Sequence, residues 1–262
     1  MKIPLYQIDA FTGRVFAGNP AAVCPLDQWL PDHVMQSIGL ENNLSETAFI
    51  VPKNGEYAIR WFTPAVEVDL CGHATLASVY ALFNILEPNR ASVTFSSRSG
   101  PLGVRKQDDT LVMDFPSLPP KPVNPPPALL AALNVKPSSV LIADNGNYMA
   151  VYDREDDVRA LKPDMTLLGS IGDAHAFICT APGKEADFVS RFFAPKQGIP
   201  EDPVTGSAPS TLTPYWSKRL DRNPLRALQI SARGGELFCE DRGDRVGIAG
   251  RAALYLEGAI HI

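Results

Sequence analysis

The chain has 262 residues, of which 45% are hydrophobic and 20% are charged, and its formal net charge is −5. This composition is typical of a globular protein with enough residues for two domains that each bury a core. The acidic balance and the lack of a basic tract argue against nucleic acid or an anionic membrane surface as a main partner. No run of 18 apolar residues is present, which excludes a membrane-spanning helix.

The start of the chain and its cysteines bear on location and cofactors. Residues 1–9 contain no signal-peptide core or cleavage site, so we expect a cytoplasmic protein. The cysteines are scattered without a C-x-x-C pair, and this spacing predicts reduced thiols and no metal site. They are Cys24, Cys71, Cys179 and Cys239. Neither a G-x-G-x-x-G nor a P-loop pattern occurs, so the sequence indicates no nucleotide cofactor.

Most of the chain has the pattern of short strands separated by turn residues. The strands expected in the first half are Leu5–Ala10, Ala21–Cys24, Thr47–Val51, Tyr57–Phe62, Ser92–Ser96 and Leu102–Phe115, the last broken like a hairpin at Asp108-Asp109. Those expected in the second half are Val140–Ala143, Tyr148–Tyr152, Ala176–Thr180, Phe188–Phe193, Leu228–Ala232, Glu236–Glu240 and Val246–Leu256. Many short strands and few long helices favour barrels or rolled sheets.

The expected helices are fewer and of two kinds. Surface helices are expected at Pro31–Leu40, Pro126–Leu133 and Val158–Ile171. The segment His73–Leu86 has almost no polar face, so a helix there must be enclosed, and a rolled sheet wrapped around it would do so. Its counterpart is Ser207–Leu220, where we expect Pro214 to kink or shorten the helix.

One pattern occurs twice in the chain. The run Arg60-Trp61-Phe62-Thr63-Pro64 returns as Arg191-Phe192-Phe193-Ala194-Pro195, 131 positions later (191 − 60). Each copy is followed by a glycine that begins a helix, Gly72 and Gly206, 134 positions apart (206 − 72). The period is far longer than that of a solenoid, so the repeat predicts a duplicated domain.

The proline-rich run over residues 115–127 predicts the linker between the two copies, because proline cannot continue a strand ladder. We therefore expect a first domain over 1–117, completed by a strand at 250–262, and a second over 118–249. Helix starts carry unpaired N–H groups and partial positive charge, which suit a carboxylate. We expect the starts at Gly72-His73 and Gly206-Ser207 to face one cleft.

Several of these motifs, taken together, resemble those of a known family. They are Asp9-Ala10-Phe11-Thr12, Phe16-Ala17-Gly18-Asn19-Pro20, Leu44-Ser45-Glu46-Thr47-Ala48-Phe49, the run from Phe62 to Thr75, and Glu201-Asp202-Pro203-Val204-Thr205-Gly206-Ser207-Ala208. In this order, along nearly the whole chain, they resemble the phenazine-biosynthesis PhzF-like isomerase family. The resemblance implies the diaminopimelate epimerase fold: an α+β protein of two pseudo-symmetric domains, each a β-barrel or rolled sheet around a central helix. It also implies an active site between the domains, no cofactor, and a homodimer.

The resemblance assigns the general acid/base to Glu46. This residue precedes the apolar run 47–51, where a carboxylate would be partly desolvated, as a proton-shuttling base requires. From the pattern alone, a solvated or helix-capping glutamate is the more common interpretation. His73 stands at the start of the buried helix, so we expect a neutral imidazole, although it could simply be satisfied by local backbone.

The remaining candidates come from both copies of the repeat. Asp202 precedes Pro203, and the resemblance gives it an active-site role, whereas a helix-capping aspartate is the alternative. Gly72, Gly206 and Ser207 are expected to approach the substrate, and Asn19, in a turn, is a possible further contact. The structural residues are expected to be Arg60 and Arg191, which tie strands, and Cys179, Cys239 and His175, which lie in the core.

Two interpretations are open for Cys71, a catalytic thiol and a buried structural one. In epimerases and racemases of the implied fold, two facing cysteines remove and return a proton. Cys71 occupies the first of these positions, and the second is expected at Asp202. A two-thiol mechanism is therefore disfavoured, and a buried thiol is expected instead.

These observations predict a cofactor-independent isomerase that acts on a small carboxylate-bearing substrate. The family's namesake reaction isomerises trans-2,3-dihydro-3-hydroxyanthranilate, which serves here as a prototype. Two alternatives stay open: an amino-acid epimerase or racemase that uses Cys71, and a non-catalytic protein that binds small molecules or partners on the same scaffold.

Overall fold

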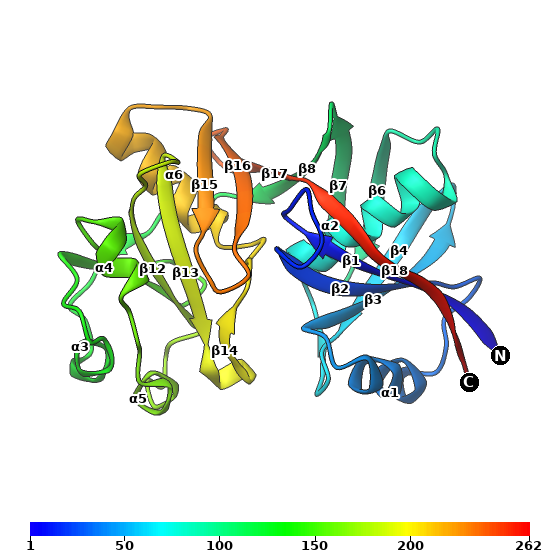
Figure 1. Cartoon of the computed structure of the whole chain (residues 1–262), viewed down its shortest axis with the longest axis horizontal. Helices are drawn as coiled ribbons and strands as arrows, with labels where there is room; N and C mark the ends of the chain where they lie inside the picture. The colour runs from blue at the N-terminus through cyan, green and yellow to red at the C-terminus, as the bar shows by residue number, and fades with distance from the viewer. The chain divides into compact units, whose positions relative to one another are not determined.

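The chain folds into two compact units. The computed structural model describes all residues, 1–262. Unit 1 comprises Met1–Asp114 and Ile248–Ile262, and unit 2 comprises Phe115–Gly247. Each has its own strands, helices and core (Figure 1).

Unit 1 is built around one strongly bent sheet. Its strands are β1 (Lys2–Ala10), β2 (Asn19–Pro25), β3 (Glu46–Lys53), β4 (Glu56–Phe62), β5 (Glu67–Val68), β6 (Ser92–Ser97), β7 (Gly100–Gln107), β8 (Thr110–Pro116) and β18 (Ala252–His261). Antiparallel pairs join β18 to β1, β1 to β2, β3 to β4, β4 to β5, β6 to β7 and β7 to β8. Parallel pairs join β2 to β3 and β4 to β6. The hairpin expected at Asp108-Asp109 is confirmed, since it links β7 to β8.

A buried helix forms the centre of unit 1. α2 (Gly72–Ala81) continues into one π-helical turn, Leu82–Leu86, and of its ten residues only Tyr80 is not buried. It packs against β1, β2, β3 and β18. The prediction of an apolar helix enclosed by a rolled sheet is confirmed, because a helix without a polar face is stable only when covered on all sides.

A second helix of unit 1 packs against the sheet from outside. α1 (Asp32–Asn42) buries Met35 and Ile38 against β3 and β4. Phe49 and Phe62 stack edge to face beneath it, with ring centroids 5.6 Å apart. This second apolar layer fixes β3, the strand that begins with Glu46.

Unit 2 has nine strands and four short helices. The strands are β9 (Lys121–Pro122), β10 (Ser139–Ile142), β11 (Asn147–Val151), β12 (Ala176–Pro182), β13 (Phe188–Ala194), β14 (Ile199–Asp202), β15 (Leu225–Gln229), β16 (Gly235–Asp241) and β17 (Arg245–Gly250). The helices are α3 (Pro127–Ala132), α4 (Glu155–Arg159), α5 (Met165–Gly169) and α6 (Pro209–Leu220). Its core includes Tyr148 stacked on Phe177.

The strands of unit 2 repeat the pairing order of unit 1. The series β1–β2–β3–β4–β6–β7 is antiparallel, parallel, antiparallel, parallel and antiparallel. The series β10–β11–β12–β13–β15–β16 has the same five directions in the same order. In each unit a short strand, β5 or β14, pairs with a central strand, and the next helix along the chain is α2 or α6. The predicted duplication of an α+β domain is therefore confirmed.

α6, the helix of unit 2 that corresponds to α2, has twelve residues and continues past Pro214 without a break. Proline has no N–H group and cannot donate to the carbonyl four residues earlier, which is that of Ser210. The backbone N–H of Leu118 donates to that carbonyl instead, at 2.8 Å. The expected shortening at Pro214 does not occur, because the proline-rich segment supplies the missing donor.

Three other boundaries differ from the prediction. Residues 158–171 do not form one helix: Pro163 interrupts it, and the Asp164 side chain caps α5 by accepting from the N–H groups of Thr166 and Leu167. Residues 246–256 form two strands, β17 and β18, and not one. The strand expected at 228–232 is β15, which begins three residues earlier and ends at Gln229.

The C-terminal strand pairs with the N-terminal one within unit 1. β18 and β1 are antiparallel from Lys2 opposite His261 to Ala10 opposite Ala252. The N–H of Ile262 donates to the carbonyl of Met1 at 2.9 Å, so the two ends of the chain lie side by side (Figure 1). No helix of the protein has both the length and the apolar character needed to cross a bilayer.

Candidate active site

Glu46 is the first residue of β3 and is 8% exposed. Its neighbour in the parallel strand β2 is Ala21, and the next residue, Thr47, pairs with Phe62 of β4. The side-chain amide of Asn42 donates to the hydroxyl of Thr47 at 3.0 Å. Glu46 is thus held on a central strand whose two neighbours leave its backbone little freedom.

Cys71 and His73 enter the site from the start of α2. Cys71 is the N-cap residue, and its carbonyl accepts from both the backbone N–H and the hydroxyl of Thr75, at 3.1 Å and 2.6 Å. His73 is the second residue of the helix, with 4% of its surface exposed. The fully buried first turn of α2 therefore fixes the positions of the thiol and the imidazole.

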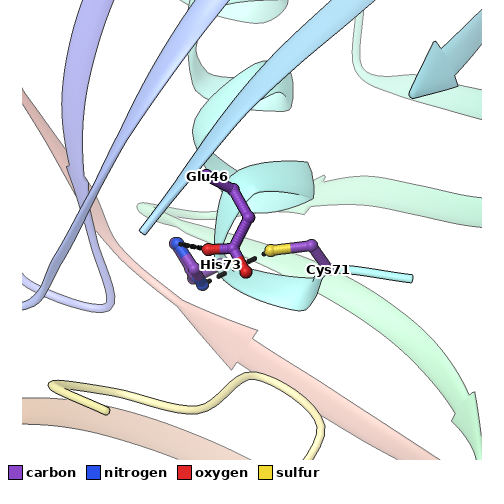
Figure 2. Close-up of side chains that lie close together, drawn as sticks. All are labelled: Glu46, Cys71 and His73. Carbon is purple, nitrogen blue, oxygen red and sulfur yellow. Dashed lines mark hydrogen bonds and ion pairs between the residues drawn. The ribbon is translucent and has the colours of Figure 1, made fainter. Parts of the chain in front are cut away.

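These three side chains form one cluster inside unit 1 (Figure 2). Glu46 Oε2 lies 3.1 Å from His73 Nε2, and Cys71 Sγ lies 3.5 Å from His73 Nδ1. Glu46 Oε2 and His73 Nε2 face each other as an ion pair, although neither makes a hydrogen bond of regular geometry.

The charge of His73 is set by its neighbours. Burial by itself disfavours the imidazolium, but the interactions with Cys71 and Glu46 outweigh burial and raise the pKa of His73 well above its ordinary value. The direction of this shift is opposite to that expected from the helix start. A carboxylate 3.1 Å away acts more strongly than the partial charge of a helix terminus.

Burial acts in the opposite sense on Cys71. Burial, and after it the charge of Glu46, raise the pKa of the Cys71 thiol to about 11. At neutral pH the group is therefore a thiol, which is a weak base and a weak nucleophile. This agrees with the prediction of a buried thiol and argues against proton abstraction by Cys71.

Asp202 lies at the end of β14 in unit 2, where it is 8% exposed. The hydroxyl of Thr205 donates to Asp202 Oδ2 at 2.6 Å. The side chain of Gln229 accepts from the Thr205 N–H at 2.9 Å and donates to the Asp202 carbonyl at 2.7 Å. These bonds connect the loop between β14 and the turn at Gly206 to Gln229 of β15.

The repeat shows which residue of unit 2 corresponds to Cys71. Asp202 pairs with Phe192 as Val68 pairs with Trp61, so Asp202 is the counterpart of Val68. Three residues further on, the counterpart of Cys71 is Thr205. Within the repeat, the residue that corresponds to Cys71 is therefore Thr205 and not Asp202.

The predicted substrate-binding residues lie in different surroundings. Gly72 begins α2 and is buried, whereas Gly206 and Ser207 form a turn before α6, which begins at Pro209 and not at Ser207. Ser207 is partly exposed. Asn19 is not in a turn: it is the first residue of β2, fully buried, and its side-chain oxygen accepts from the hydroxyl of Ser45 at 3.4 Å. A role in substrate binding stays a prediction for all four.

The two repeated arginines are structural, as predicted. Arg60 donates twice to Glu67, at 2.7 Å for both bonds, and lies over the ring of Phe62. Arg191 donates twice to Glu201, at 2.7 and 2.9 Å, and lies over the ring of Phe193.

Two of the three residues that were predicted to lie in the core are buried. Cys179 and Cys239 are buried, so the prediction for them is confirmed. His175 is exposed and lies against Gln197, so its assignment to the core is wrong. It stands just before β12, whose residues are buried from Ala176 to Ala181.

Sequence reasoning missed Thr205, Gln229 and the glutamate partners of the arginines. One signal was available for three of these residues: Glu67 and Glu201, like Gly72 and Gly206, are 134 positions apart (201 − 67), and the same offset leads from Cys71 to Thr205. Gln229 carries no such signal, since only the pairing of β15 with β13 brings it beside Thr205.

The fold recurs in epimerases of known structure. A hydroxyproline epimerase from Agrobacterium vitis superposes with a TM-score of 0.65, over 99% of this chain and 92% of that one, at 12% identity. The fold is thus that of the diaminopimelate and proline epimerases, and the class it defines is a two-domain α+β protein with a rolled sheet around a central helix in each domain.

Closer comparisons give the family. Residues 8–258 match the family of phenazine biosynthesis-like proteins, PhzC-PhzF, and the chain belongs to this family. It is 49% identical over 262 residues to a Pseudomonas aeruginosa protein named as an uncharacterized isomerase, and the match covers all of both chains. A PhzF-family protein from Enterococcus faecalis of known structure superposes with a TM-score of 0.96 at 45% identity, over 100% of each chain. The family and its curated relatives identify the chain as an enzyme of the isomerase class.

Proposed function

We propose that the chain is a cofactor-independent isomerase that moves a proton between two positions of a small carboxylate-bearing molecule, with Glu46 as the proton carrier. The observation that carries this proposal is the buried carboxylate of Glu46, 3.1 Å from the His73 imidazole. The two atoms that face each other, Glu46 Oε2 and His73 Nε2, are both buried, and neither makes another hydrogen bond of regular geometry.

The proposed reaction needs a base that is fixed in place and shielded from water. Glu46 accepts a proton from a carbon that conjugation has made acidic, and then returns the proton to another position of the same molecule. His73 stabilises the carboxylate while it is charged, because an imidazolium 3.1 Å away attracts it. A base held on a strand end is already in position, so much of the rate enhancement comes from positioning.

The start of α2 supports the choice of a carboxylate-bearing substrate. The N–H groups of Gly72 and His73 belong to the first turn, where no intrahelical acceptor exists for them. Together with the helix dipole, they favour an anionic group. The family resemblance assigns Asp202, Gly206 and Ser207 to the same reaction, and we retain them as proposed site residues.

The experiment that tests the proposal compares three variants with the wild type. Candidate substrates are screened, beginning with trans-2,3-dihydro-3-hydroxyanthranilate, for a turnover that can be measured. We expect Glu46→Gln to lower kcat by about 10²–10⁴-fold, the usual contribution of a general acid/base, and Glu46→Asp to keep part of the activity. The matched control is Glu41→Gln on α1, which removes an exposed carboxylate and should change nothing. A folded Glu46→Gln protein with full turnover would refute the proposal.

A further inference from the structure

Glu46, Cys71 and His73 also form a set of metal donors. A carboxylate oxygen, a thiol sulfur and an imidazole nitrogen, one from each residue, all lie within 4.8 Å of one another, and all three residues are buried. The donors come from the first residue of β3 and from the N-cap and second residue of α2, so backbone structure holds them close together. The spacing of the cysteines in the sequence predicted no metal site. That spacing could not show that Glu46 lies beside Cys71 and His73, because the fold brings them together.

The distances suit a zinc ion. Zinc binds imidazole nitrogen at about 2.0–2.1 Å and thiolate sulfur at about 2.3 Å, so two such ligands of a tetrahedral ion lie about 3.5 Å apart. Cys71 Sγ and His73 Nδ1 are 3.5 Å apart. The carboxylate of Glu46 is close enough to become the third ligand by rotation about its side-chain bonds.

The pairing inside the cluster is incomplete. Glu46 Oε2 lies 3.1 Å from His73 Nε2 as an ion pair, but neither atom makes a hydrogen bond of regular geometry. A metal ion bound by the carboxylate would add a contact that the ion pair does not supply. Sulfur and imidazole donors select zinc over magnesium or calcium, which prefer oxygen alone.

We propose that Glu46, Cys71 and His73 bind Zn²⁺ as three protein ligands, with water as the fourth, and that bound zinc stops the isomerase. Binding converts the Cys71 thiol to a zinc-bound thiolate and the His73 imidazolium to a neutral ligand that has lost its Nδ1 proton, so two protons are released to solvent. Inhibition follows because the carboxylate of Glu46 is then occupied by the metal. This inhibitory half rests on the proposed function, whereas the metal site does not.

Cobalt tests the site without any measurement of activity. Metal-free protein is titrated with Co²⁺, whose tetrahedral complexes absorb strongly in the visible and whose thiolate complexes show a charge-transfer band in the near ultraviolet. We expect both bands to saturate at one equivalent, and one equivalent of Zn²⁺ to abolish them. A wild-type protein that shows no thiolate band would overturn the proposal.

Two variants and a control assign the ligands. Cys71→Ser should lose the thiolate band and bind Zn²⁺ at least about 10-fold more weakly. Removing a group that only hydrogen-bonds to a metal ligand already weakens binding by about this factor, and Cys71 is proposed as a ligand itself. His73→Gln should weaken zinc binding similarly, and it decides the matter if Cys71→Ser does not fold. Cys24→Ser is the control, because Cys24 is an equally buried thiol on β2. Unchanged zinc affinity in a folded Cys71→Ser or His73→Gln protein would contradict the assignment.

Turnover in the presence of Zn²⁺ then separates the two proposals. Inhibition that a chelator reverses, with the cobalt bands present, supports both. Cobalt bands without any turnover in metal-free protein would overturn the proposed function and the inhibitory half, and leave the metal site standing. Turnover without cobalt bands would overturn the metal site alone.

Discussion

Gln229 donates a hydrogen bond from its side-chain amide to the backbone carbonyl of Asp202, at 2.7 Å. The same amide group accepts from the Thr205 N–H, and Gln229 is only 1% exposed. Gln229→Leu removes both of these buried hydrogen bonds, so we expect it to lower the free energy of unfolding by about 2–4 kcal/mol. Urea denaturation measures the change. Gln197→Leu, at an exposed glutamine of the same unit, should change it by less than about 0.5 kcal/mol; equal effects of the two variants would contradict this account.

Arg60 and Arg191 are equivalent in the repeat, but replacing them should destabilise the protein to different extents. Arg191 binds Glu201 and also donates to the carbonyls of Val158 and Leu161, at 3.2 and 2.8 Å. We expect Arg191→Met to destabilise the protein by about 2–4 kcal/mol, somewhat less than the loss of a fully buried ion pair, because the Arg191 and Glu201 side chains are 13% and 25% exposed.

Arg60→Met should have a smaller effect than Arg191→Met. Glu67 would keep Arg98, whose guanidinium lies 2.7 Å from the carboxylate. Urea unfolding of the two variants under the same conditions gives the comparison. The account is wrong if Arg60→Met proves the more damaging of the two.

The bond from Leu118 to Ser210 predicts a position that does not tolerate proline. Leu118→Pro removes the N–H that serves the carbonyl left free by Pro214, so we expect a loss of about 1–3 kcal/mol in the free energy of unfolding. Asn124→Pro introduces a proline into the same segment at an exposed residue and is the control. Thermal or urea unfolding distinguishes them, and equal stability of the two variants would show that the bond is unimportant.

Three cysteines should resist alkylation in the folded protein. Burial raises the pKa of Cys24, Cys179 and Cys239 to about 12. Relative to a free cysteine, the thiolate fraction at pH 8 falls about 10³-fold, and the reaction with iodoacetamide slows accordingly. Mass spectrometry after brief labelling should find these three residues unmodified in native protein and modified in urea. Rapid labelling of native Cys24 would contradict the structure around β2.

Much of the fold could be predicted because its signals are local. The apolar run after Gly72 has no polar face, so it predicts a buried helix and thereby the sheet around it. The two arginine motifs predict the duplication because each arginine needs the same glutamate partner at the same place. One predicted helix, over residues 158–171, is wrong because Pro163 interrupts an otherwise helical pattern.

The geometry of the candidate site could not be predicted in the same way. Glu46 and His73 are 27 positions apart (73 − 46), and only the packing of α2 against β3 brings them into contact. That contact raises the pKa of His73, whereas the position at the helix terminus, taken from the local sequence alone, predicts a lower pKa. The tolerance of α6 for Pro214 depends likewise on a donor far away in the chain, at Leu118.

The central claim is that Glu46 carries the proton, and proton NMR in D₂O tests it most directly. Wild type and Glu46→Gln are each mixed with trans-2,3-dihydro-3-hydroxyanthranilate, and the carbon-bound hydrogens of the substrate are followed over time. The account predicts that wild type alone removes a ring C–H signal, as deuterium enters from a carboxylate that exchanges with solvent. Loss of the signal at the same rate with folded Glu46→Gln would contradict it.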